Sequence, residues 1–212
     1  MINLDYYMQN KTILITGANG EIGQNLISQL SSKIFDNTII ALDLNESQYK
    51  NSIHEFIKGS ILDSNIILDI FTRYSIDVVF HLAAILSTKA EENPHLAKEV
   101  NLGGSEILMH ASLQATQKIK FFFPSSIAVY NTANLNSDTC VNEDLVDIRP
   151  ITIYGQTKLA CENIGVKFNN YGFDFRCIRF PGIISASTMP TGGTSDYAPE
   201  MIHYAAQNKK YN

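Results

Sequence analysis

Cysteine is scarce in this sequence of 212 residues. The three cysteines, Cys140, Cys161 and Cys177, are widely spaced and form no C-x-x-C pair. This pattern favours neither a disulfide framework nor a zinc site. Apart from His81, the histidines are His54, His95, His110 and His203. Their spacing along the sequence is not that of metal ligands. We therefore expect structural thiols and no bound metal.

Long apolar runs and an excess of basic charge are also missing. No stretch approaches the roughly 18 apolar residues of a membrane span, and the opening MINLDYYMQN lacks the basic and apolar regions of a signal peptide. The formal net charge of -5 provides no basic surface for nucleic acid. These absences predict a cytoplasmic protein without a membrane or nucleic-acid partner.

The remaining composition is that of a globular protein, with 45% hydrophobic and 17% charged residues. Short apolar runs alternate with helical periodicity along the chain. We expect strands at 11–16, 38–42, 55–58, 77–81, 119–123 and 174–178, and helices at 21–31, 65–74, 92–115 and 152–170. This alternation predicts an α/β fold with a doubly wound parallel sheet of the Rossmann type. The polar, aperiodic segment 131–150 is expected to be a surface excursion near the substrate.

A glycine-rich loop follows the first predicted strand and opens the first predicted helix. Its glycines, Gly17, Gly20 and Gly23, allow a tight turn and close approach of a pyrophosphate to the helix N-terminus. Asp43 ends the second predicted strand, where its carboxylate would bind a ribose diol and repel a 2′-phosphate. The loop therefore predicts NAD rather than NADP. Asp63 either binds the adenine edge or serves as the acid at a helix N-terminus.

Tyr154 and Lys158 lie four residues apart in a predicted helix, so both side chains project from one face. A phenol ordinarily loses its proton near pH 10. Lowering the pKa of Tyr154 by about three units requires roughly 4 kcal/mol of preferential interaction with the phenolate, which we expect the partly desolvated Lys158 ammonium and a hydroxyl donor to supply together. The pair would then provide a base that works near neutral pH.

Six motifs, in this order, resemble the extended short-chain dehydrogenase/reductase family, which includes nucleotide-sugar epimerases, dehydratases and some amino-acid dehydrogenases. They are TGxxGxxG at 16–23, HLAA at 81–84, NLGG at 101–104, PSSIAVY at 124–130, YxxxK at 154–158 and RFPG at 179–182. The resemblance implies that Ser126 is catalytic together with Tyr154 and Lys158, with Ser125 the weaker choice. It also implies that Leu82, Ala83 and Ala84 lie along the cofactor and that Asn101 supports the active-site hydrogen bonds. The full set of expected NAD contacts is Gly17, Asn19, Gly20, Glu21, Ile22, Gly23, Asp43, Leu62, Asp63, Leu82, Ala83, Ala84, Asn101, Tyr154, Lys158 and Pro181.

Within that family, the stretches FPGIIS at 180–185 and PTGGTSDYA at 190–198 are similar to the epimerase-type L-threonine 3-dehydrogenases. The departures from that subgroup are Glu21, Thr191, Ser195 and Pro199. The similarity implies oxidation of the L-threonine hydroxyl to 2-amino-3-oxobutanoate with NAD. The substrate contacts that it implies are Ser87, Ser126, Tyr154, Gly193, Thr194 and Ser195. Ser87 could instead cap a helix, and the turn at 192–195 could be a simple surface turn.

Two other functions stay open: a nucleotide-sugar epimerase or dehydratase, and a non-catalytic NAD-binding module. Residues 1–180 are expected to form the NAD-binding domain and 181–212 to begin a substrate-binding lobe that is largely cut off. A homodimer through helices 92–115 and 152–170 is compatible with a set of apolar residues that core packing explains equally well: Leu96, Val100, Leu108, Ile164 and Phe168. We expect His81 to satisfy a backbone partner, and Glu91 and Glu92 to be solvated.

Overall fold

The computed structural model describes residues 8–31, 36–46, 52–131, 141–143, 148–184, 193 and 196–211. Within these residues, six strands form one parallel sheet in the order β3-β2-β1-β4-β5-β6. The strands are β1 (Thr12–Thr16), β2 (Thr38–Asp43), β3 (Glu55–Lys58), β4 (Val78–His81), β5 (Lys120–Ser126) and β6 (Asp174–Phe180). The strand order reverses direction between β1 and β4, so the crevice at their carboxyl ends is the expected ligand site of an open α/β sheet. The predicted doubly wound fold is confirmed.

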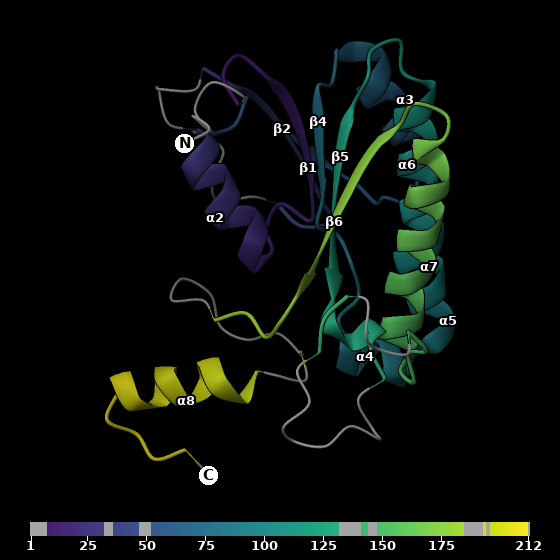
Figure 1. Ribbon diagram of the computed structural model, residues 1–212. Coiled ribbons are helices and arrows are strands. Elements are labelled where there is room, and N and C mark those ends of the chain that lie inside the picture. Colours follow the sequence, from purple (N-terminus) through teal and green to yellow (C-terminus); the bar gives the residue numbers. More distant parts are fainter. Residues whose placement is uncertain are drawn as a thin grey trace.

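Helices cover both faces of the sheet. Figure 1 shows α2 (Glu21–Leu30) on one side and α3 (Ser64–Arg73), α6 (Ser105–Gln114) and α7 (Ile153–Asn169) on the other. The short helices α4 (Ser87–Glu92) and α5 (Pro94–Ala97) precede α6, and α8 (Tyr197–Ala206) is drawn apart from the sheet. Among the described residues, no helix is both long and apolar enough to cross a bilayer.

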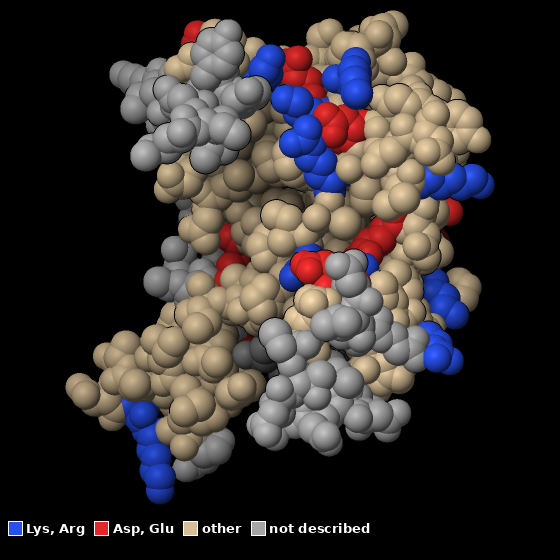
Figure 2. Space-filling view, in the orientation of Figure 1, with Lys and Arg blue, Asp and Glu red and all other residues tan. Residues whose placement is uncertain are grey.

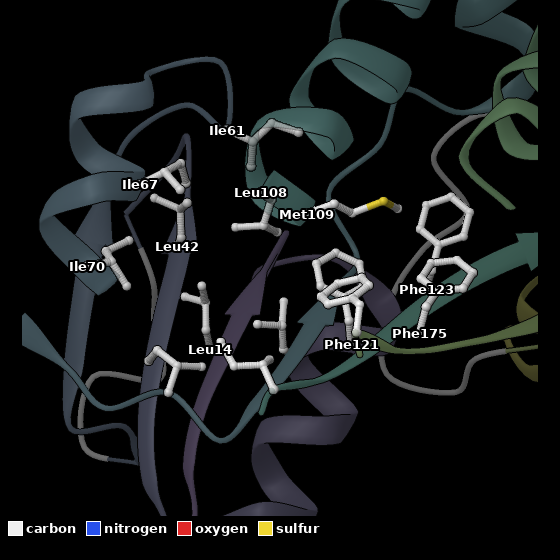
Figure 3. Packing of buried hydrophobic residues seen from close by; sticks show 14 of the residues in the cluster. Leu14, Leu42, Ile61, Ile67, Ile70, Leu108, Met109, Phe121, Phe123 and Phe175 are labelled. Atoms are coloured by element: carbon white, nitrogen blue, oxygen red, sulfur yellow. The ribbon is translucent and has the colours of Figure 1, made fainter. Parts of the chain in front are cut away.

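Side chains of β1 and β2 alternate between two buried clusters, as the period of two in a strand requires. Leu14, Ile40 and Leu42 face the cluster under α3, α6 and α7, which also contains Phe121 (Figure 3). Ile13, Ile15, Ile39 and Ala41 face the cluster under α2. Because both faces are buried, these strands are apolar at nearly every position, which explains why the sequence pattern located them.

The helix predicted over 92–115 is present, but its bounds and its middle differ from the expectation. Helical residues run without a break over 94–114, and the π-helix η2 (Lys98–Gly104) lies between α5 and α6 in this run. Gly104 lies against Ile61, where a Cβ would come within 2.5 Å of the Ile61 Cδ1 atom. The helical periodicity of the sequence does not reveal the wider π turn, a feature that is frequent at functional sites.

Most of the residues proposed for a dimer interface belong to the core. Leu108 is fully buried, and Val100, Ile164 and Phe168 pack against the larger cluster. These three side chains are only partly buried, and Leu96 is 41% exposed. Core packing therefore accounts fully for Leu108 and in part for Val100, Ile164 and Phe168. Most of the segment 131–150 lies outside the described residues.

Candidate active site

The glycine loop joins β1 to α2 through contacts that exclude larger side chains. Gly17 has a φ of +66°, and a Cβ there would come within 2.6 Å of the Ala83 nitrogen. A Cβ on Gly23 would come within 2.6 Å of the Ala18 oxygen and 2.7 Å of the Gly17 oxygen. The loop thus packs tightly on the segment after β4 and leaves the N-terminus of α2 accessible to an anion. These positions fit the phosphate-binding role predicted for them.

Asp43 occupies the carboxyl end of β2, beside this loop. Its Oδ2 atom accepts a hydrogen bond from the Asn19 backbone nitrogen at 3.0 Å, and its Oδ1 atom accepts one from the Asn45 nitrogen at 3.2 Å. The Asn19 amide in turn donates to the Asn45 carbonyl at 2.7 Å. The carboxylate is therefore fixed in orientation at the place where the sequence predicted recognition of the ribose.

Asp63 is the N-cap of α3. Its Oδ1 atom accepts hydrogen bonds from the backbone nitrogens of Asn65, at 3.0 Å, and Ile66, at 3.3 Å. The capping alternative from the sequence is therefore confirmed. Contact of Asp63 or its neighbour Leu62 with the adenine ring stays a prediction.

The segment after β4 is anchored at both ends. The Ala83 nitrogen donates to the Thr16 hydroxyl at 3.4 Å. At Ile85, the nitrogen donates to the Asn101 Oδ1 atom at 2.7 Å, and the carbonyl accepts from the Asn101 Nδ2 atom at 3.0 Å. Asn101 lies in η2 and is buried. These contacts hold the segment expected to line the cofactor, and a role of Asn101 in the active-site hydrogen bonds stays a prediction.

Ser126, Tyr154 and Lys158 come from β5 and α7. Ser126 ends β5, and its hydroxyl accepts a hydrogen bond from the Ala128 nitrogen at 3.1 Å, which caps the 3-10 helix η3 (Ile127–Val129). A Cβ on Gly155 would collide with the Ala128 carbonyl. The first turn of α7 therefore packs directly on the segment that begins at Ser126, and this contact places Tyr154 beside it.

The Lys158 ammonium is buried and donates to the Pro124 carbonyl at 2.7 Å. It lies 4.5 Å from the Phe123 ring centroid and 5.5 Å from that of Tyr154. Burial lowers the pKa of Lys158 to about 8 and raises the pKa of Tyr154 to about 12. The two side chains are neighbours, as predicted, but the expected lowering of the Tyr154 pKa is absent because desolvation of the phenol dominates.

A network beneath Ser126 was missed in the sequence. Glu162 is buried, and its carboxylate binds Arg179 in a two-point ion pair, with Nη2 to Oε2 at 2.7 Å and Nε to Oε1 at 3.0 Å. Ser125 donates to the same carboxylate, and Arg179 donates to the Tyr130 hydroxyl at 2.9 Å. Because the Ser125 side chain is committed to this network, the geometry is compatible with Ser126 as the candidate catalytic serine, which stays a prediction. The signal available in the sequence was Glu162, four residues beyond Lys158 on α7.

The capping role of Glu91 was also missed. Its side chain is exposed, as expected, but its Oε1 atom also accepts hydrogen bonds from the backbone nitrogens of Ile153, at 2.7 Å, and Tyr154, at 3.4 Å. Glu91 therefore caps α7 from α4, together with Thr152, whose hydroxyl accepts from the Gly155 nitrogen at 3.0 Å. A negative charge at this N-terminus also complements the helix dipole.

The predicted substrate contacts are only partly described. Ser87 was expected either to contact the substrate or to be a helix N-cap. In the structure the N-cap of α4 is Leu86, and Ser87 is the first residue of the helix. The Gly193 nitrogen donates to the Asp196 carboxylate at 2.7 Å. Thr191, Thr194 and Ser195 lie outside the described residues. Pro181, an expected cofactor contact, is exposed just beyond β6. Pro199, one of the departures from the subgroup, is buried in α8.

Charges of both signs are intermixed on the face that Figure 2 shows, and no broad basic surface dominates it. Among the described residues, no group of three or more histidine, cysteine, aspartate or glutamate side chains is placed to hold a metal ion.

Comparison with known proteins agrees with this geometry. A family model described as the NAD dependent epimerase/dehydratase family matches residues 13–211. The mitochondrial L-threonine 3-dehydrogenase of Bos taurus is 35% identical over 205 residues, which are 94% of this chain and 52% of that protein. An uncharacterized epimerase/dehydratase of Staphylococcus aureus is 36% identical over 207 residues, 95% of this chain and 62% of that protein.

Solved structures give the same result. The L-threonine dehydrogenase of Clostridium difficile superposes with a TM-score of 0.84 at 34% identity, covering 96% of this chain and 63% of that one. The chain thus spans about half the length of the bovine relative, 52%, and 62% of the staphylococcal one. Since the family model extends over nearly all of its residues, the chain belongs to the NAD-dependent epimerase/dehydratase family, and NAD is the cofactor that its glycine loop and Asp43 fit.

Proposed function

We propose that this protein oxidises the hydroxyl of L-threonine to 2-amino-3-oxobutanoate with NAD. The observation that carries the proposal is the placement of Tyr154 and Lys158 on one buried face of α7, packed against the end of β5 that bears Ser126. The named dehydrogenases among the relatives support the choice of substrate.

NAD binding is assigned to the loop and strand ends around β1 and β2. The α2 N-terminus behind Gly17, Gly20 and Gly23 takes the pyrophosphate, and Asp43 takes the adenine ribose. The segment Leu82–Ala84 lies along the dinucleotide. NAD, when bound, supplies the hydride acceptor.

Tyr154 accepts the hydroxyl proton, and Ser126 orients the same hydroxyl. Burial holds the pKa of Tyr154 at about 12, so its ionised form depends on the positive charge of Lys158 and on the Ser126 hydroxyl. A shift from about 12 to about 7 requires roughly 7 kcal/mol of stabilisation of the phenolate. Lys158 is positioned to contribute because its buried ammonium lies 5.5 Å from the Tyr154 ring centroid.

The substrate carboxylate and amino group are assigned to Ser87, Gly193, Thr194 and Ser195, on the similarity of these segments to the L-threonine dehydrogenases. In this proposal, residues 1–180 form the NAD-binding domain and 181–212 begin the substrate-binding lobe. Assembly as a homodimer and a cytoplasmic location complete the proposal. The exposed side chains Leu96 and Val166 are available for a dimer contact.

The second candidate is a nucleotide-sugar epimerase or dehydratase, favoured by the staphylococcal relative. It would use the same serine, tyrosine and lysine, but a sugar nucleotide needs cationic groups for its diphosphate. A non-catalytic NAD-binding module is the third possibility.

The test is NADH formation, followed by ultraviolet absorbance, with L-threonine or a UDP-sugar as substrate. L-threonine should support turnover and the UDP-sugar should not. Tyr154→Phe should reduce turnover by at least about a hundredfold while calorimetry shows unchanged NAD affinity. Tyr171→Phe, at a tyrosine 68% exposed, is the matched control. An epimerase or dehydratase returns the hydride to the sugar and accumulates no NADH, so conversion of the UDP-sugar is followed by chromatography of the sugar nucleotide. Conversion of the UDP-sugar alone would favour the epimerase, and NAD binding without turnover of either substrate would favour the binding module.

A further inference from the structure

His81 is buried between two hydroxyl groups at the carboxyl end of β4. Its Nδ1 atom lies 2.7 Å from the Thr16 hydroxyl of β1, and its Nε2 atom lies 2.8 Å from the Ser105 hydroxyl of α6. The imidazole is 1% exposed. The expectation of a backbone partner for His81 is therefore wrong, because both ring nitrogens bind side chains from other elements.

The donor and acceptor of each hydrogen bond around His81 can be assigned from two groups whose roles are fixed, the Asn101 carbonyl and the Ala83 backbone N–H. The Asn101 carbonyl can only accept, so Ser105, at 2.5 Å, donates its hydroxyl proton to it. The Ser105 oxygen must then accept from the His81 Nε2–H group. A neutral imidazole has one N–H, so Nδ1 accepts from the Thr16 hydroxyl, whose oxygen in turn accepts from the Ala83 backbone nitrogen at 3.4 Å.

One directed chain of hydrogen bonds thus runs from Ala83 through Thr16, His81 and Ser105 to the carbonyl of Asn101. The Asn101 side chain is hydrogen-bonded to the backbone of Ile85, two residues beyond Ala83, so the network begins and ends on the same segment. Asn101 also donates to the Thr157 hydroxyl at 3.4 Å. Thr157 donates to the Tyr154 carbonyl at 2.8 Å, so the hydrogen-bond network extends to α7, the helix that carries the proposed base.

We propose that His81 is a positioning residue for NAD binding: as a neutral Nε2–H imidazole it fixes the segment Ala83–Ile85 against β1 and η2. Neither ring nitrogen has access to the cofactor, so His81 acts through the backbone that it holds. The inference uses only the NAD binding of the family and holds for any substrate.

The surroundings of His81 oppose a second proton on the ring. Burial, and then the positive charge of the neighbouring Lys158, lower the pKa of His81 to about 3. The rings of Phe121 and Phe123 flank the imidazole, with centroids at 6.0 and 6.1 Å. A cationic ring would also require the Thr16 hydroxyl to turn away from Nδ1, because Nδ1 would then be a donor.

The first test reads the tautomer directly. Nitrogen NMR of the protein labelled in histidine, in the absence of NAD, should show His81 with a protonated Nε2 and an unprotonated Nδ1 at neutral pH. The His81 signals are assigned through their displacement in Thr16→Ser and Ser105→Ala. The opposite tautomer, or a ring protonated at both nitrogens, would overturn the proposal without bearing on the choice of substrate.

The second test measures NAD affinity by calorimetry in variants on the two sides of the ring. Thr16→Val and Ser105→Ala should each weaken NAD binding by about tenfold, the change expected from one lost buried hydrogen bond. Thr16→Ser, which keeps the hydroxyl, should restore the affinity. Since the chain acts as one unit, the double variant should also lose about tenfold.

The matched control is Ser112→Ala. Ser112 is buried in α6 and donates to the Leu108 carbonyl at 2.8 Å, with the same four-residue spacing as Ser105 and Asn101. The Ser112→Ala substitution should lower the free energy of unfolding in urea by about as much as Ser105→Ala does, and it should leave NAD affinity within about twofold of the wild type. A double variant about a hundredfold weaker than the wild type, or a Ser112→Ala variant as weak as Ser105→Ala, would overturn the proposal.

Discussion

The Lys158 ammonium lies 5.5 Å from the centre of the Tyr154 ring and donates its hydrogen bond to the Pro124 carbonyl. Both side chains leave α7 on the same face, one turn apart, and both are largely withdrawn from water. The same burial that brings the charge close to the phenol also opposes ionisation of each group. The free energy of ionising either member of this proposed proton-transfer pair therefore depends on which other groups enter its surroundings.

The buried ammonium of Lys158 should make stability depend on pH. Its pKa is about 8 in the folded chain, against an ordinary value of 10.5, so the unfolded chain binds more protons between these pH values. The free energy of unfolding should therefore rise as pH increases from about 8 to 10.5, by about 3 kcal/mol from this residue. Lys158→Met should lack this rise in urea unfolding followed across the pH series.

Lys167→Met, at an exposed position of the same helix, is the control for that experiment and should keep the pH profile of the wild type. A Lys158→Met profile parallel to the wild type would show that the ammonium is solvated after all.

The Glu91 carboxylate should be a measurable helix cap. Glu91→Ala removes the acceptor for the Ile153 and Tyr154 nitrogens and should lower the free energy of unfolding by about 1 kcal/mol. Turnover should fall as well, because the first turn of α7 carries Tyr154. Glu92→Ala, at the adjacent exposed glutamate, should change stability by less than about 0.5 kcal/mol. Equal effects of the two substitutions would contradict the cap.

The ion pair of Glu162 and Arg179 should behave as a buried pair. Glu162→Gln leaves a mostly buried guanidinium without its counter-charge and should cost about 3 kcal/mol in urea unfolding. Replacing both residues by leucine should cost less than this single change, since no charge is then left unpaired. Asp174→Asn, in the more exposed ion pair with Arg176 on the same strand, should cost at most about 1 kcal/mol. A double leucine variant with a lower free energy of unfolding than Glu162→Gln would indicate that the ion pair itself stabilises the fold.

The two adjacent glycines of η2 should respond in opposite directions. Gly104→Ala forces a Cβ against Ile61 and should destabilise the protein by about 1 to 3 kcal/mol. Gly103 has nothing within 4 Å of a built Cβ. Gly103→Ala should therefore be neutral or stabilising by up to about 1 kcal/mol, since alanine restricts the unfolded chain. Thermal unfolding of both variants measures the difference, and a destabilised Gly103→Ala would mean that η2 requires glycine at both positions.

The strands could be located from the sequence because the apolar pattern of a strand lies in consecutive residues. A strand buried on both faces must be apolar at successive positions, as at residues 13–15, and the pattern is visible without a partner. The glycine loop and the spacing of Tyr154 and Lys158 were readable for the same reason. The boundaries were less certain, since β5 continues through Pro124 to Ser126, and the π turn in η2 leaves no mark on an apolar periodicity.

The sequence by itself determined the order of strands and helices, the phosphate loop with its acid at Asp43, and the serine, tyrosine and lysine of the proposed site. Only the tertiary structure decided that His81 binds Thr16 and Ser105, that Glu91 caps α7 from 62 residues away, and that Glu162 holds Arg179. Periodicity and turn chemistry act between residues close in the chain, whereas these contacts join elements that meet only after packing. Burial in the same packed interior also set the pKa of Tyr154, which no local pattern could supply.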